Sequence, residues 1–186
     1  MTGNKILIGA VSITSSITFL ALVVWLHLVE PGYDPVNQLM SELALGAHGK
    51  VMLFAFFALA TALAALGWNF SIARAHPLLI FCDGLAAACF AGAGVLRLDN
   101  ATEAHIALIA VAFVACGLAM YLLPSNIPLF SEAQDRWASW GLGSLVVLSV
   151  ALGHSLIPMG IAQRFAAMAL LIWLIVINWR LMRLSA

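Results

Sequence analysis

The stretch HIALIAVAFVACGLAMYLL, residues 105–123, decides how the rest of the chain must fold. It contains no Asp, Glu, Lys or Arg, and it is close to the ~20 residues that a helix needs to cross a hydrocarbon core about 30 Å thick. Nearly every helix of the chain is expected to lie in lipid, because similar stretches flank this one on both sides. The six stretches are residues 6–29, 51–70, 78–96, 105–123, 138–156 and 161–179.

The composition leaves no room for a water-soluble domain. Of the 186 residues, 64% are hydrophobic and 9% are charged, against roughly 25% charged in a typical globular chain. We therefore expect one integral membrane domain, residues 1–186, with an all-α fold: a six-transmembrane-helix bundle and a short interfacial helix in the first outer loop. The formal net charge is zero and the cations are scattered singly, which argues against nucleic acid as a partner.

The cationic residues near the ends of the stretches predict the orientation in the membrane. With six spans, both termini lie on one side of the membrane. That side carries five cations and the opposite side three, so both termini are expected in the cytoplasm. The five are Lys5, Arg74, Arg136, Arg180 and Arg183, and the three are Lys50, Arg97 and Arg164.

The first outer loop predicts a short helix that lies flat on the membrane surface. Asp34 suits the N-cap, Pro35 the first helical position and Gly46 the end. Apolar residues would then form one stripe and polar residues the other. The apolar stripe is Val36, Leu39, Met40 and Leu43, and the polar one is Asn37, Gln38, Ser41 and Glu42. The polar face either belongs to a site or is simply hydrated, as on many interfacial helices.

The third loop predicts the start of the fourth helix. Asn100 is the expected N-cap, and Glu103 three residues later completes a capping box. His105 follows two residues further into the helix, at the depth where headgroups give way to acyl chains.

The fifth loop leads into Gln163 and Arg164 at the start of the last stretch. A cation there faces the positive end of the helix dipole, which costs a few tenths to about 1 kcal/mol. Arg164 is therefore expected to pair with a carboxylate, or else to extend to lipid phosphates. The carboxylates available are Asp34, Glu42, Asp99 and Glu103.

Four histidines fall near the outer ends of four different helices: His27, His48, His105 and His154. Imidazole is a ligand for both zinc and haem iron. No HExxH pattern or cysteine partner accompanies them, so we expect interfacial or hydrogen-bonded histidines and no metal or other cofactor.

One acid, Asp83, lies inside the third stretch. Ionisable residues within membrane spans are functional candidates by default. A structural hydrogen bond to Asn178 or Arg180 is the alternative.

Several loop motifs are similar to those of a known family. They are Glu30-Pro-Gly-Tyr-Asp-Pro, Ser41-Glu-Leu, a polar third loop followed by a histidine, and Gly160-Ile-Ala-Gln-Arg164. In these the chain resembles the prokaryotic domain of unknown function 998 (DUF998) family of six-helix membrane proteins. The resemblance implies the topology, a prokaryotic inner membrane and a cluster of residues on the outer face, and it implies no activity.

These features predict an outward-facing polar site that binds a lipid headgroup, a small molecule or a partner protein. The alternative is a membrane-embedded, metal-dependent hydrolase with His27, His48, His105 and His154 as ligands. A transporter is disfavoured, because broken helices and paired charges at the membrane centre are missing. The residues expected at the polar site are Tyr33, Asp34, Asn37, Ser41, Glu42, Glu103, His105, Gln163 and Arg164.

Overall fold

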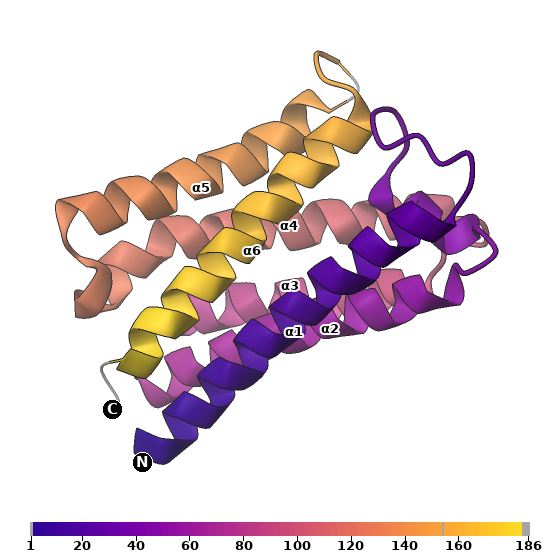
Figure 1. The fold of residues 1–186 in the computed structure, drawn as a ribbon. Coiled ribbons are helices and arrows are strands. Elements are labelled where there is room, and N and C mark those ends of the chain that lie inside the picture. Colours follow the sequence, from indigo (N-terminus) through magenta and orange to yellow (C-terminus); the bar gives the residue numbers. More distant parts are fainter. Residues whose placement is uncertain (1, 154, 184–186) are drawn as a thin grey trace.

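The computed structural model describes residues 2–153 and 155–183, with side chains from residue 4 onward. Within these residues the chain forms six α-helices and two 3-10 helices (Figure 1). The all-α prediction is therefore confirmed. The elements are α1 (Thr2–Val29), η1 (Met40–Leu45), α2 (Lys50–Ile72), α3 (Pro77–Val95), α4 (Thr102–Asn126), η2 (Pro128–Phe130), α5 (Ala133–Leu152) and α6 (Met159–Arg183).

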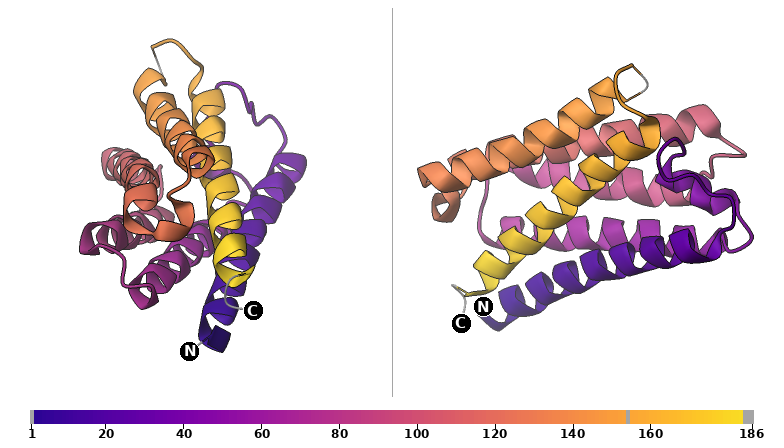
Figure 2. Two further views of the ribbon diagram at one scale, coloured as in Figure 1. Left: turned by 90° about the vertical axis from the view of Figure 1, so that its left-hand side faces the viewer. Right: turned by 45° about the horizontal axis from the view of Figure 1, so that its top comes forward.

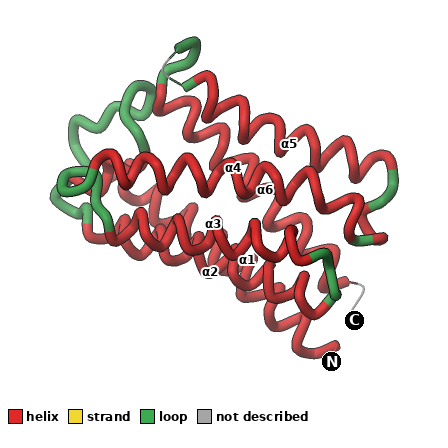
Figure 3. The backbone as a smooth tube through the Cα atoms, turned by 180° about the vertical axis from the view of Figure 1, so that it is seen from behind, coloured by secondary structure: helices red, strands yellow, loops and turns green. Residues whose placement is uncertain are grey.

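The six α-helices pack as a closed bundle. Each packs against its neighbours in sequence, and α6 also packs against α1 (Figure 2). Short connections make consecutive helices antiparallel, so α1 begins and α6 ends at the same end of the bundle (Figure 1). We call the opposite end, which carries η1 and the α3–α4 and α5–α6 connections, the distal end; most of the loop residues gather there (Figure 3).

Five helices in the described part of the chain are long and apolar enough to cross a membrane. They are the ranges Asn4–Val29, Lys50–Ile72, Pro77–Val95, Thr102–Asn126 and Met159–Arg183. Large apolar side chains on their outer surfaces are exposed, among them Phe54, Phe81 and Trp68, as expected of helices that face lipid. The length and apolarity of these five helices suggest a multi-pass membrane protein.

The first loop folds differently from the prediction. Its helix is a single 3-10 segment that begins at Met40 rather than at Pro35. Asp34 does not cap it, because its carboxylate accepts a hydrogen bond from the N–H of Val36 and so forms a local turn. Ser41, placed on the polar stripe by the sequence, is buried, whereas Val36 is exposed. The periodicity of an α-helix, from which the apolar and polar stripes were predicted, therefore does not apply to this loop.

The predicted cap of the fourth helix is also wrong. The helix begins at Thr102, and Ala101 rather than Asn100 occupies the N-cap position. No described side chain caps the helix, and the Thr102 hydroxyl donates back to the carbonyl of Leu98 at 2.6 Å. Glu103 lies exposed in the first helical turn.

Asp83 is fully buried, and neither predicted partner forms a hydrogen bond with it. Asn178 donates to the hydroxyl of Ser12 at 2.9 Å, and Arg180 forms an ion pair with Asp135. The carboxyl oxygens of Asp83 accept no hydrogen bond from any described residue. The proposed structural hydrogen bond is thus not formed.

Candidate functional site

The first loop lies over the beginning of α6. The carbonyl oxygens of Pro35, Val36 and Gln38 surround Gly160, where a methyl carbon would come within 2.7 Å of all three. The N–H of Ile161 donates to the carbonyl of Val36 at 3.3 Å. The loop thus places several carbonyl dipoles against the electropositive start of a helix, which is a favourable arrangement.

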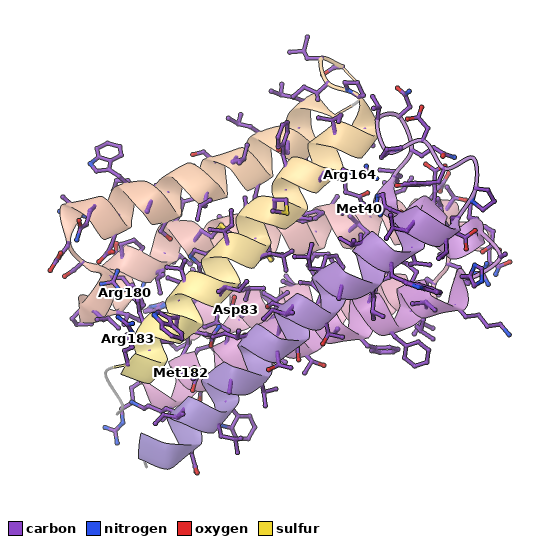
Figure 4. The ribbon with its side chains drawn as sticks, viewed as in Figure 1. Met40, Asp83, Arg164, Arg180, Met182 and Arg183 are labelled. Atoms are coloured by element: carbon purple, nitrogen blue, oxygen red, sulfur yellow. The ribbon has the colours of Figure 1, made fainter. Side chains whose placement is uncertain are left out.

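Arg164 is held by backbone carbonyls, a histidine and a phenol. Its Nη1 donates to the carbonyl oxygens of Gly160 at 2.8 Å and Gln38 at 3.4 Å. Its Nη2 lies 2.7 Å from His27 Nε2 and donates to the Tyr33 hydroxyl at 2.7 Å. The predicted ion pair with a carboxylate is wrong: none of the ion pairs between described residues includes Arg164. Arg164 lies near the start of α6, beside the first loop (Figure 4). The carbonyl oxygens of Gln38 in that loop and Gly160 in α6 take the place of the expected anion.

The hydrogen bonds around Arg164 fix the tautomer of His27. Its Nδ1 lies 2.6 Å from the carbonyl oxygen of Val23, one turn earlier in α1, and must donate to it. Nε2 therefore carries the lone pair that accepts from Arg164. The Tyr33 hydroxyl in turn donates to the carbonyl of Leu39 at 3.0 Å. Burial raises the pKa of Tyr33, against the opposing effect of Arg164, so the phenol keeps the proton that it donates.

Asp34, Asn37 and Glu42 organise the first loop itself. The Asn37 amide donates to the Asp34 carboxylate at 2.6 Å, and this hydrogen bond is the main reason that the pKa of Asp34 lies below its usual value. Glu42 accepts a hydrogen bond from the N–H of Leu39 at 2.8 Å. Asn37 and Glu42 also line an open depression between the first loop and the α5–α6 connection. These predicted site residues therefore stabilise the conformation of the first loop.

Glu30 is a structural residue that the sequence analysis did not single out. Its carboxylate accepts hydrogen bonds from the N–H groups of Ala47 at 3.0 Å and His48 at 2.5 Å. A methyl carbon on Gly46 would lie 2.2 Å from a Glu30 oxygen, so glycine leaves the space that the carboxylate occupies. Glu30 thereby anchors the end of the first loop to the end of α1.

Three predicted site residues line one cavity at the distal end. Ser41, His105 and Gln163 lie on its wall, together with mostly apolar side chains of α4, α5 and α6. The cavity measures about 240 Å³, more than the ~150 Å³ of an engineered apolar cavity that binds benzene. Its lining consists of Leu39, Ser41, His105, Ile106, Ile109, Ala110, Phe113, Ser149, Val150, Gly153, Met159, Ala162 and Gln163.

Two of these lining residues each have a buried polar atom without a hydrogen-bond partner in the described part of the chain: Ser41 Oγ and His105 Nε2. Both residues are 1% exposed. His105 Nδ1 lies 2.7 Å from the carbonyl oxygen of Leu96 and 2.9 Å from that of Ala93, so the proton resides on Nδ1 and Nε2 is an acceptor. Gln163 is already engaged, because its Oε1 accepts from the N–H of Met40 at 2.6 Å. Unpaired buried polar atoms are uncommon, and each calls for an explanation.

The loop motifs and the bundle agree with a known family. A family model described as "Protein of unknown function (DUF998)" matches residues 13–180. The chain belongs to this family. The match runs from within α1 to within α6 and confirms the resemblance given by the loop motifs. No curated protein and no solved structure matches the chain.

In this DUF998 chain the predicted histidine ligands do not converge. His27 contacts Arg164, His48 lies 3.3 Å from Glu30, and His105 contacts two carbonyl oxygens. His154 lies outside the described residues. Among the residues that are described, no three His, Cys, Asp or Glu side chains gather where a metal ion could bind. The hydrolase alternative therefore has no support from this arrangement.

Two residues on the wall of the distal cavity, Ser41 and His105, can form further hydrogen bonds with a ligand. His105 Nε2 can accept one hydrogen bond, and the Ser41 hydroxyl can donate one and accept others. A ligand that satisfies both needs a hydroxyl or similar group beside an apolar body. Tyr33 and Arg164 lie in the loop contacts beside the cavity rather than on its wall, and exposed Glu103 is not on the wall either.

Proposed function

We propose that the chain crosses the cytoplasmic membrane of a prokaryotic cell six times, with both termini inside and the distal end outside. The sixth span would be α5. Because α4 ends at one end of the bundle and α6 begins at the other, α5 has to carry the chain back, and its 20 residues extend over about 30 Å. The first loop, with η1, would then lie at the outer interface.

The polar groups in α5 are compatible with that placement. Ser139 donates to the carbonyl of Met120 at 2.7 Å and accepts from the indole of Trp173 at 3.1 Å. Trp140 donates to the carbonyl of Tyr121 at 3.2 Å. Groups that would be costly in lipid are thus paired within the protein.

Fusions to alkaline phosphatase, which is active only outside the cytoplasm, test the orientation. Fusions after Gly46 and Asn100 should be active, and fusions after Arg74 and Ser131 should be inactive. The opposite pattern would place the distal end in the cytoplasm and contradict the proposal.

We further propose that the distal cavity binds an uncharged amphiphile, with its hydroxyl group at Ser41 and His105 and its chain along the apolar wall. The observation that carries this function is that Ser41 and His105, whose Oγ and Nε2 are buried and have no partner among the described residues, both line one cavity. Binding would replace two unsatisfied groups by hydrogen bonds, each worth about 0.5–1.5 kcal/mol. A monoacylglycerol has both the hydroxyls and the chain.

Binding of radiolabelled 1-monooleoylglycerol to purified protein, measured by scintillation proximity, tests this function. Ser41→Ala should weaken binding about fivefold, since it removes one hydrogen bond of about 1 kcal/mol. The same variant should keep its thermal stability, because Ser41 Oγ has no partner in the described structure to lose. Weaker binding at unchanged thermal stability would indicate that Ser41 contacts the ligand. A loss of both would indicate a structural role.

A variant that fills the cavity provides a second test of the proposed binding. Ala110→Phe should abolish binding, because Ala110 lines the cavity. Ala104→Phe is the matched control, since Ala104 is exposed on the same helix and is not on the cavity wall. Binding that is equal in the wild type, Ser41→Ala and Ala110→Phe would refute the proposed site.

A further inference from the structure

A second cavity lies on the outer surface of the bundle between α2 and α3. It measures about 460 Å³ and occupies the distal end of both helices. Its wall is apolar, and Phe54 and Val95 on it are each 63% exposed. Gly94 on its wall allows α3 to approach α2 closely, since a methyl carbon there would lie 2.9 Å from Phe56 Cβ. We call this surface the α2–α3 groove.

Two cationic residues line the α2–α3 groove at its distal end. Lys50 is the first residue of α2, and Arg97 follows the end of α3 by two residues. Because the two helices are antiparallel neighbours, both cations lie at one level of the bundle. In the six-span arrangement that level is the outer headgroup region.

The two cations are only partly neutralised by the protein. Lys50 is exposed, and its side chain forms no hydrogen bond or ion pair with a described residue. Arg97 donates to the carbonyl of Ala44 at 2.9 Å and lies 3.2 Å from Asp99, in an ion pair whose side chains are 40% and 42% exposed. Its Nε is buried and has no partner in the described part of the chain. Glu30, an acid at the same end of the bundle, lies 3.3 Å from His48.

We propose that the α2–α3 groove binds a membrane glycerophospholipid with a net negative headgroup. The phosphate would lie between Lys50 and Arg97, and one acyl chain would follow the apolar wall past Phe54 and Val95. Each basic residue near the surface strengthens the binding of an anionic lipid about fivefold. A zwitterionic lipid carries its own cation beside the phosphate and gains less from the same pair.

This site is distinct from the amphiphile cavity. The two share the ring of His105, which is part of both walls, but they open between different helices. Binding in the α2–α3 groove depends on charge at Lys50 and Arg97, whereas the amphiphile cavity offers neutral hydrogen-bonding groups. The two proposals can therefore fail independently.

Photolabelling tests the α2–α3 groove directly. Full-length protein is reconstituted in phosphatidylcholine vesicles that contain either phosphatidylglycerol or further phosphatidylcholine with a diazirine in one acyl chain. Labelled peptides from α2 and α3 are then quantified by mass spectrometry. The phosphatidylglycerol probe should label these two helices more strongly, and Lys50→Gln with Arg97→Gln should reduce that labelling about fivefold or more.

Two further variants make the result decisive. Val95→Trp fills the groove from an exposed position, so it should remove the labelling without loss of fold. Lys5→Gln with Arg136→Gln removes the same charge from the opposite end and should leave the labelling of the distal ends of α2 and α3 unchanged. Equal labelling by both lipids, or no effect of Val95→Trp, would overturn the proposal. Competition by inorganic phosphate as effective as that by unlabelled phosphatidylglycerol would overturn it too, since it would show a site for free phosphate.

Discussion

Replacement of Gly160 by alanine should detach the first loop from α6 and lower the free energy of unfolding by about 3 kcal/mol. The added methyl carbon would lie 2.5 Å from the carbonyl oxygens of Pro35 and Gln38 and 2.7 Å from that of Val36. These are backbone atoms, which cannot rotate away as the end of a side chain can. The loop must therefore move as a whole, and the contacts that depend on it must weaken.

The measurement is thermal unfolding in detergent, together with the rate of proteolysis within the first loop. Both should change together in Gly160→Ala. Gly141→Ala is the matched control, because no atom beyond its helix lies within 4 Å of a methyl carbon there. Alanine in place of a helical glycine should even stabilise by up to about 1 kcal/mol. Equal stability of the wild type and Gly160→Ala would show that the carbonyl oxygens do not surround this residue.

The helices were predictable from the sequence because their cause is local. Each apolar stretch specifies its own helix, and the short connections between stretches specify antiparallel neighbours. The boundaries are less accurate: α4 extends to Asn126, three residues beyond its apolar stretch. Loop structure was predicted poorly, since Asp34 and Thr102 use their side chains for local hydrogen bonds that compete with the expected caps.

Part of the lining of the candidate cavity could be anticipated from the sequence. Ser41, His105 and Gln163 do meet on one wall, although they come from three separate segments. The sequence could not show which residue holds Arg164, because His27 is 137 positions away and a neutral histidine carries no charge to suggest the pairing. Arg164 does have partners, as its position at the electropositive start of a helix predicts. They are a neutral histidine, a phenol and carbonyl oxygens instead of the expected acid.

Arg164→Ala should also destabilise the protein, by about 2–4 kcal/mol, since hydrogen bonds from a charged donor are each worth about 1.5–3 kcal/mol. The loss leaves His27 Nε2 without its donor and frees the carbonyl of Gln38. Arg164→Lys should recover only a part of the stability. An ammonium group lacks the planar fork that reaches His27 and Tyr33 from one nitrogen and two carbonyls from the other.

Double-mutant cycles identify the partners of Arg164. Tyr33→Phe removes the hydroxyl that accepts from Arg164, so its effect should overlap with that of Arg164→Ala, with a coupling of about 0.5–3 kcal/mol. Glu42→Gln is the control: Glu42 makes no ion pair with Arg164, and the two effects should add within about 0.5 kcal/mol. Coupling of Arg164 to Glu42, without coupling to Tyr33, would instead support the predicted ion pair with a carboxylate. A silent Arg164→Lys with additivity in both cycles would instead mean that the side chain extends to lipid, because a phosphate accepts either cation. The hydrogen bonds of Arg164 to His27, Tyr33 and the carbonyl oxygens predict a different combination. Arg164 should couple to Tyr33, and Arg164→Lys should lower the stability.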